Sequence, residues 1–398
     1  MMRLLPSQTA RVWGALIVLA ALLLIGRAKL LGEMSNQLLR DMQNAGPNAV
    51  GMDLITQNYY EELLKEDREA EWRGLGVFRL FIIKKINPDF EEQSRAEGTG
   101  SERIRFHEHG LLPHSLKPYV SEMNKGVMIT TNRWGHRDTD DYDTTPEPGV
   151  FRIALVGSSN SLGYGVEFHE GFEQRLEKKL NEALPQMSAY HRYEIINFAV
   201  HQYQLIERAY VVRNLAPVFN PHLILVEGTM LDMRRTLYES LAKRVSNGCD
   251  VELEFVRDIV RRSHADSKSN RLKIEQRLQQ YTTELMAGCY ADMAQVQRET
   301  GIPVVPMMLR LEVDTTHRNL HQMAAVAESA GLNVLRIFDA YEGQTAKEMY
   351  LTDRDYHPSA FAHRLLAEDI FDKMMANPAV RSLLLGPAAA DGVARSQQ

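Results

Sequence analysis

The chain has 398 residues, enough for one large domain or two moderate ones. Hydrophobic residues make up 44% and charged residues 25%, as in an ordinary globular protein. The formal net charge of −6 offers no basic surface, so we expect no nucleic-acid partner. The two cysteines, Cys249 and Cys289, are too few for a disulfide framework or a four-sulfur zinc site. They are expected as two unpaired thiols, with a single bridge as the alternative.

An apolar run near the N-terminus predicts a membrane anchor. Residues 12–26 are apolar without interruption, and basic residues stand on both sides of the run. If Arg27 and Lys29 extend their charges toward the headgroups, the apolar stretch approaches the length that spans a ~30 Å hydrocarbon core. A cleaved signal peptide and a buried core helix are the alternatives. We expect residues 1–32 to be the anchor or signal, and the protein to be a single-pass membrane protein with an extracytoplasmic domain.

The rest of the chain falls into segments that differ in their pattern of apolar and polar residues. Residues 33–149 are expected to form a helical or mixed extension and lead-in, with a mostly helical pattern over 33–120, and residues 379–398 a tail. Between them, short apolar runs alternate with amphipathic stretches. Strands are expected at 151–156, 193–198, 222–227, 303–308 and 333–337, and helices at 172–184, 206–215, 320–330 and 360–375. This alternation predicts a three-layer α/β/α sandwich with a central parallel five-stranded sheet over residues 150–378, with a charged helical insert at 235–300.

One serine and an Asp-x-His pair near the C-terminal end of the chain are the candidate catalytic residues. Ser159 follows the first predicted strand, whereas Asp355 and His357 precede the last helix. A serine hydroxyl is a weak nucleophile unless a base such as histidine takes its proton. A carboxylate can hold the imidazole tautomer and stabilise its charged form. Because loops at the carboxyl edge of a parallel sheet meet, we expect Ser159 as nucleophile, His357 as base and Asp355 as orienting acid.

These residues resemble the sequence blocks of the SGNH/GDSL hydrolase superfamily. Its first block is Gly-Asp-Ser with a glycine four positions later, and this chain has Gly-Ser-Ser at 157–159 and Gly163. Its last block is Asp-x-His-Pro, which matches residues 355–358. Residues 131–138 resemble the Asn-x-x-Gly-x-Arg lead-in of bacterial, often membrane-anchored, members. The resemblance implies an SGNH/flavodoxin-like fold and a Ser159–Asp355–His357 catalytic set, with no cofactor and no metal.

The two middle blocks of the superfamily supply donors to the oxyanion hole, and this chain departs from both. Ala199 or Gln202 stands where the second block has a glycine, and Leu231-Asp232 stands where the third has Asn-Asp. Losing one such donor typically costs ~10²–10³ in rate. The candidate oxyanion donors are Ser159, Ala199, Asn160 and Gln202. The candidate pocket residues are Ser158, Asp232 and His201.

Together, these patterns predict serine-dependent ester chemistry, either an O-acyl esterase or an O-acyltransferase. The resemblance to anchored bacterial proteins implies an acylated cell-envelope or exopolysaccharide glycan as substrate, or a small ester, and the membrane as a partner through the N-terminal helix. The alternative is a catalytically inactive SGNH-fold binding or scaffold protein in a membrane-associated assembly. The sequence leaves the oligomeric state open.

Overall fold

The computed structural model describes residues 103–233, 236–312, 318–352 and 355–386. The predicted anchor at 1–32, and residues 33–102 of the predicted extension, lie outside the described residues. Within the described ranges, no helix is long and apolar enough to cross a membrane.

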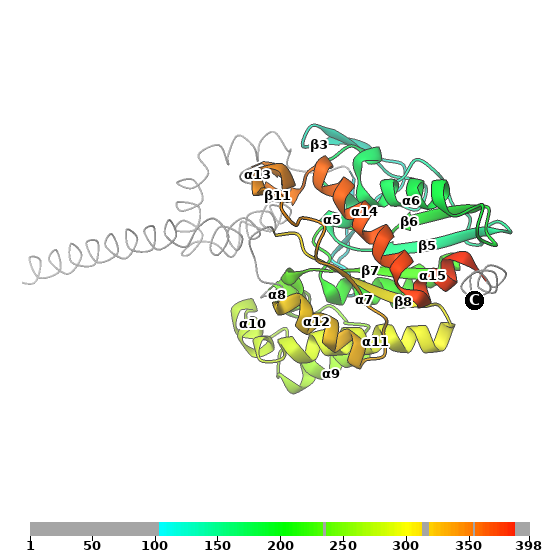
Figure 1. Cartoon of the computed structure of the whole chain (residues 1–398). Helices are drawn as coiled ribbons and strands as arrows, with labels where there is room; N and C mark the ends of the chain where they lie inside the picture. The colour runs from blue at the N-terminus through cyan, green and yellow to red at the C-terminus, as the bar shows by residue number, and fades with distance from the viewer. Residues whose placement is uncertain (1–102, 234–235, 313–317, 353–354, 387–398) are drawn as a thin grey trace, which may run out of the picture. The chain divides into compact units, whose positions relative to one another are not determined.

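The core of the described region is a five-stranded, all-parallel sheet with the order β6-β5-β7-β8-β9 (Figure 1). Its strands are β5 Val150–Val156, β6 Arg192–Asn197, β7 Leu223–Gly228, β8 Val304–Leu309 and β9 Leu335–Ile337. All residues of β5, β7 and β8 are buried, as expected for a sheet that is covered on both faces. The five predicted strands are confirmed. Because β6 and β7 flank β5, the crossover direction reverses at β5, where such sheets place their ligands.

Helices cover both faces of the sheet (Figure 1). One layer contains α6 Phe172–Ala183 and α14 Ala360–Ala376, and the other contains α7 Leu205–Asn214, α11 Thr282–Thr300 and α12 Arg318–Ser329. The apolar stripe predicted on α6 is buried against the sheet. It consists of Phe172, Leu176, Leu180 and Leu184. The three-layer sandwich is therefore confirmed.

The predicted insert at 235–300 is helical. It contains α8 Thr236–Ser246, α9 Glu254–Arg262 and α10 Arg271–Gln279, and then α11. Helix α11 contacts both α7 and β8, so it also serves as the crossover that covers the sheet. Cys249 and Cys289 are free thiols, which excludes the predicted alternative of a bridge.

Two antiparallel hairpins precede the sheet. Strand β1 Ile104–Phe106 pairs with β2 His114–Leu116, and β3 Ser121–Asn124 pairs with β4 Val127–Thr130. Residues 103–149 contain no helix, so the mostly helical pattern predicted over 33–120 was wrong for residues 103–120. Strands of three or four residues are too short to produce a readable hydrophobic period.

The sandwich extends beyond its predicted boundary at residue 378. Residues assigned to the tail form α15 Pro378–Leu385, which packs against α14. Val380 and Leu384 are fully buried in the same core cluster as α14. The side chain of Asn377 caps this helix by accepting from the N–H groups of Ala379 and Val380. A Pro at the first helical position is a known start signal that the sequence prediction did not use.

Candidate active site

Ser159 begins the short helix α5 Ser159–Leu162, directly after the loop that leaves β5. The loop starts with Gly157, where an added Cβ would lie within 2.7 Å of Glu227 Oε2, so a larger residue does not fit. Ser158 is the N-cap of α5, and Gly163 ends it in the left-handed conformation with φ 73°. The predicted nucleophile thus sits at the carboxyl edge of the central strand.

A buried carboxylate holds this loop together. Glu227, near the end of β7, accepts from Ser158 N at 2.9 Å and from Ser158 Oγ at 2.5 Å. It also accepts from Asn160 Nδ2 at 3.1 Å, and from Ser161 Oγ and N at 2.5 and 3.2 Å. Burial alone would raise the pKa of Glu227, but the Arg208 guanidinium and the Ser158 and Ser161 hydrogen bonds hold it below its ordinary value. Glu227 is therefore an anion that fixes the backbone on both sides of Ser159.

The sequence prediction missed Glu227. The signal was a carboxylate next to the last position of a fully apolar strand. The parallel register pairs Val156 with Val226, which places Glu227 beside the loop that leaves β5.

His357 and Asp355 come from a two-stranded ribbon. Strand β10 Tyr350–Thr352 pairs with β11 Asp355–Pro358, and the chain then enters α14. His357 Nε2 lies 3.0 Å from Ser159 Oγ, and His357 Nδ1 lies 2.6 Å from Asp355 Oδ1. When Nδ1 carries the proton and donates it to Asp355, Nε2 accepts from the serine hydroxyl. The structure therefore brings the three predicted residues into one hydrogen-bonded chain, although they are separated by nearly two hundred positions.

Asp355 is held in its anionic form. Burial would raise its pKa, but the adjacent His357 imidazole and the Lys125 ammonium lower it well below its usual range. Lys125, at the tip of the β3–β4 hairpin, reaches Asp355 Oδ2 at 2.6 Å. The sequence prediction did not single out this lysine.

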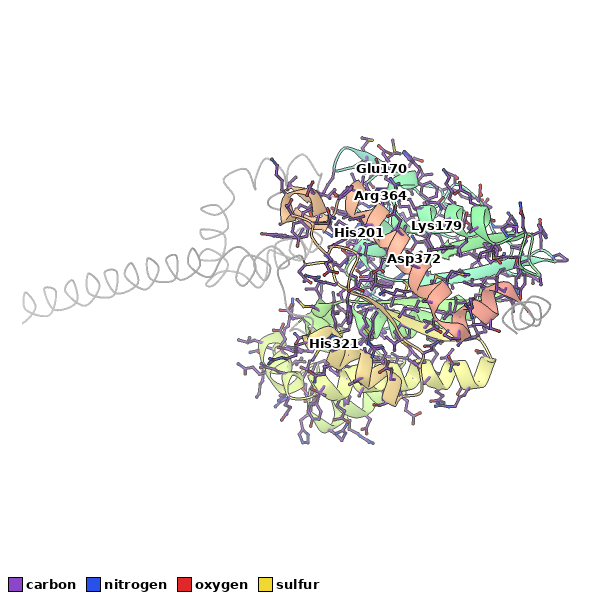
Figure 2. All side chains as sticks on the ribbon, in the orientation of Figure 1. Glu170, Lys179, His201, His321, Arg364 and Asp372 are labelled. Carbon is purple, nitrogen blue, oxygen red and sulfur yellow. The ribbon has the colours of Figure 1, made fainter. Side chains whose placement is uncertain are left out.

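His201 lies behind the base rather than in an open pocket. Its ring centroid is 5.0 Å from that of Tyr164, which is in turn 4.8 Å from that of His357. The side chain is 1% exposed, and Arg103 Nη2 lies 3.3 Å from His201 Nε2 (Figure 2, where His201 is labelled). Burial and the Arg103 charge hold the pKa of His201 well below its ordinary value, so the imidazole is neutral. The pocket role predicted for His201 is therefore replaced by packing behind Tyr164.

The upstream motif at 131–138 supports the loop after the nucleophile. Asn132 Oδ1 accepts from the N–H groups of Trp134 and His136, which shapes a turn. The turn aims Arg137, which is 2% exposed, into the core. Its guanidinium donates to the carbonyls of Leu162, Gly163 and Val166. Burial lowers the pKa of Arg137 to about 10, so it remains a cation at neutral pH.

Several predicted oxyanion donors are engaged elsewhere. The Ala199 N–H donates to Asn197 Oδ1 at 3.0 Å, and the Asn160 side-chain amide donates to Glu227. No acceptor among the described residues hydrogen-bonds to the Ser159 N–H. Gln202 has φ 64°, the left-handed conformation that a glycine at this position of the motif would adopt freely. Of the predicted set, the Ser159 N–H therefore remains a candidate, and Gln202 stays a prediction that rests on its backbone conformation.

The other two predicted pocket residues are structural. Ser158 uses its hydroxyl to bind Glu227. Asp232 is fully buried, where one oxygen pairs with Arg208 and the other accepts from Thr229 N at 2.9 Å. Neither side chain is directed at the Ser159 hydroxyl, because both are committed to neighbouring groups.

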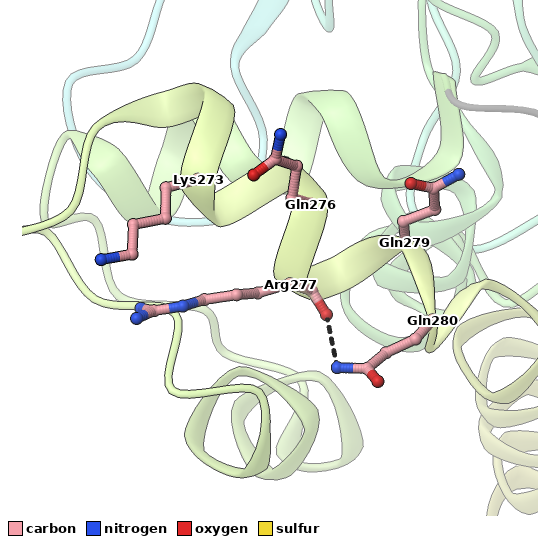
Figure 3. A pocket seen from close by; sticks show the side chains of 5 residues that line it. All are labelled: Lys273, Gln276, Arg277, Gln279 and Gln280. Carbon is pink, nitrogen blue, oxygen red and sulfur yellow. Dashed lines mark hydrogen bonds between the residues drawn. The ribbon is translucent and has the colours of Figure 1, made fainter.

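The open depression shown in Figure 3 lies on α10. Its lining residues are Lys273, Gln276, Arg277, Gln279 and Gln280. Four of them lie on α10 and Gln280 is its C-cap, and none belongs to the Ser159 loop or to β11. We therefore do not associate this depression with the Ser159 chemistry.

Comparisons with known proteins give structural neighbours only. No protein-family model matches the chain, and no curated protein matches it significantly. Solved structures that are similar include TesA (17% identity, TM-score 0.36, 56% of this chain and 98% of that chain). A catalytic mutant of Axe2, an acetylxylan esterase from Geobacillus stearothermophilus, is 12% identical (TM-score 0.36, 56% and 93%). The lipase/acylhydrolase from Enterococcus faecalis is 11% identical (TM-score 0.33, 57% and 96%). At these TM-scores the neighbours carry no argument about activity, which rests on the side chains of this chain.

Proposed function

We propose that this chain is a serine-dependent enzyme of ester chemistry, an O-acyl esterase or O-acyltransferase of the SGNH/GDSL type. One observation carries the proposal: the hydrogen-bonded chain from Ser159 Oγ through His357 to Asp355, with distances of 3.0 and 2.6 Å. A nucleophile within hydrogen-bond reach of a base, with a third group that orients the base, is the arrangement diagnostic of nucleophilic acyl transfer.

The chemistry follows from these three residues. Ser159 Oγ attacks the acyl carbonyl while His357 Nε2 takes its proton, and the carbonyl electrons move onto the oxyanion. When the intermediate collapses, the alkoxide leaves with the proton from His357, and the acyl group stays on Ser159. Water or a sugar hydroxyl then attacks the acyl-enzyme while His357 takes its proton. When this second intermediate collapses, the bond between the acyl carbon and Ser159 Oγ breaks, and His357 returns the proton to Ser159. The products are a free acid in the first case and a new ester in the second.

The number of donors in the oxyanion hole limits the catalytic rate that we expect. The Ser159 N–H is one donor, and we propose Gln202 as the source of a second one. Each missing donor would cost ~10²–10³ in rate. We further propose that the substrate is an acylated envelope or exopolysaccharide glycan and that the protein is held at the membrane by residues 1–32, by analogy with the lead-in motif.

A fluorophosphonate probe tests the proposal on the full-length chain in detergent. The activated serine displaces fluoride from phosphorus, and we expect stoichiometric labelling that disappears in Ser159→Ala. Ser158→Ala is the matched control, since its hydroxyl binds Glu227 and is not the nucleophile, so labelling should persist. Absence of labelling in folded wild-type protein would favour the non-catalytic binding or scaffold protein, an alternative that the engaged Ala199 N–H and Leu231 already motivate.

A further inference from the structure

The β3–β4 hairpin places a cation against the acid of the candidate triad. Lys125 Nζ lies 2.6 Å from Asp355 Oδ2. The other carboxylate oxygen, Oδ1, accepts from His357 Nδ1 at 2.6 Å and from His357 N at 3.1 Å. Each oxygen of Asp355 therefore has its own cationic or polar partner, and one of the two, Lys125, comes from a segment 230 residues before Asp355.

The turn that carries Lys125 does not favour a lysine. The register pairs Asn124 with Val127, so Lys125 and Gly126 form a two-residue turn. Their φ values of 48° and 80° are both positive, as a type I′ hairpin turn requires. Asn-Gly is the usual sequence for such a turn, because residues with longer side chains adopt positive φ with strain. A strained residue that makes a specific contact points to a role beyond closing the hairpin.

The ammonium is enclosed on a second side as well. Lys125 Nζ lies 5.1 Å from the ring centroid of Tyr164, whose ring also contacts that of His357. The side chain of Lys125 is 27% exposed and that of Asp355 is 15% exposed. A pair this enclosed is screened less by water and salt than a surface pair, so its charge reaches the neighbouring imidazole.

We propose that Lys125 is a positioning residue of the triad, which holds the Asp355 carboxylate anionic and turned so that Oδ1 faces His357. The inference rests on the proposed function of Ser159, His357 and Asp355. It assigns the β3–β4 hairpin to the active site, because the hairpin delivers the group that orients the acid.

The charges around the imidazole predict the effect of removing this cation. The titratable groups that face His357 are Asp355 on β11, Lys125 on the hairpin, Tyr164 after α5, His201 after β6 and His363 on α14. Burial lowers the pKa of His201 well below its ordinary value and that of His363 to about 3, so both rings are neutral at pH 7. Asp355 and Lys125 therefore supply the full charges. Without the ammonium, the carboxylate alone favours the imidazolium, and protonation of the base persists to higher pH.

The experiment compares Lys125→Met and Lys125→Arg with wild type in the full-length chain. The His357 imidazole is titrated by NMR with histidine-selective labelling, and the fluorophosphonate labelling rate is measured against pH. In Lys125→Met we expect two shifts to higher pH, each of about one pH unit. One is in the midpoint of the NMR titration, and the other is in the low-pH limb of the labelling-rate profile. The labelling rate at neutral pH should fall about tenfold. Lys125→Arg keeps the charge and should stay close to wild type.

The matched control is Lys373→Met. Lys373 is also a partly exposed lysine, 2.8 Å from Asp339, but it lies thirteen residues along α14 from Ala360, about 20 Å. This variant should leave both curves unchanged. The proposal is overturned if Lys125→Met and wild type give the same NMR titration and the same labelling rate at each pH. It is also overturned if the Met and Arg variants lose the same thermal stability and neither shows a titration shift. If wild type shows no labelling at any pH, the proposed function fails, whereas the titration still decides whether Lys125 acts on the Asp355–His357 pair.

Discussion

The two sides of the candidate active site are built differently. The nucleophile loop is anchored in the sheet by Glu227, which is 1% exposed and accepts hydrogen bonds from Ser158, Asn160 and Ser161 on both sides of Ser159. The base comes from the short β10–β11 ribbon, where the side chains of Asp355 and His357 are each 15% exposed. Lys125 of the β3–β4 hairpin forms an ion pair with Asp355. The serine is thus positioned by the core, whereas the base is positioned by surface segments. We infer that changes to Glu227, which anchors the serine loop, cost folding stability, and that changes to the acid and its lysine cost chemistry.

The largest expected effect lies on the base side. Asp355→Asn removes the charge that stabilises the imidazolium and allows the wrong tautomer of His357, so we expect a fall of ~10⁴ in the fluorophosphonate labelling rate. Denaturant unfolding should change less than after a change at Glu227, because the Asp355 side chain is 15% exposed whereas Glu227 is 1% exposed. A loss of stability as large as that of a Glu227 variant would contradict the contrast between the two sides.

Glu227→Gln tests the serine side. Glutamine offers one acceptor oxygen in place of two and brings an NH₂ group toward Ser158 and Ser161, which also donate. Removing one partner from a buried charged network costs about 3–5 kcal/mol, so we expect a loss of roughly 3 kcal/mol by urea unfolding. Glu348→Gln, on the exposed side of the helix α13 Ala346–Met349 before β10, is the control. Glutamine keeps an acceptor for the Thr345 hydroxyl, so this variant should be neutral within ~0.5 kcal/mol. If the two variants unfold at the same denaturant concentration, Glu227 does not anchor the loop.

A smaller effect concerns acid stability where α14 begins. His363 is fully buried, accepts from Phe172 N at 3.1 Å, and has a pKa lowered by burial to about 3. In the unfolded chain this histidine binds a proton near pH 6.5. The contribution of the neutral His363 to folding stability is therefore fully present above that pH. It is lost as pH falls toward 3, at up to ~1.4 kcal/mol per pH unit. His363→Asn keeps an acceptor but does not titrate, so its unfolding free energy should fall less steeply between pH 6 and 4. Parallel slopes would show that His363 is not the group that titrates.

The fold was predictable because most residues of its strands are apolar, with few polar side chains such as Arg152 and Glu227 among them. The runs at 151–156 and 222–227 could only be buried on both faces, and the helices between them show clear apolar stripes. The nucleophile and the Asp-x-His pair could be proposed because the ends of parallel strands meet at one edge. Glu227 and Lys125 could not be proposed, because their roles depend on a strand register and on a hairpin turn that local patterns do not encode. The engaged Ala199 N–H likewise depends on the side-chain rotamer of Asn197.

The distribution of the active-site residues along the chain bears on how the protein acquires its reactive form. The contact between Ser159 and His357 closes 198 residues, and that between Lys125 and Asp355 closes 230. Contacts of such long range form late, because the loop-closure entropy must be offset by structure that is already in place. A growing chain would hold a completed nucleophile loop but no base. Its serine would stay inert until β11 had docked, so the proposed reactive hydroxyl exists only after the strand that carries the base has reached its place.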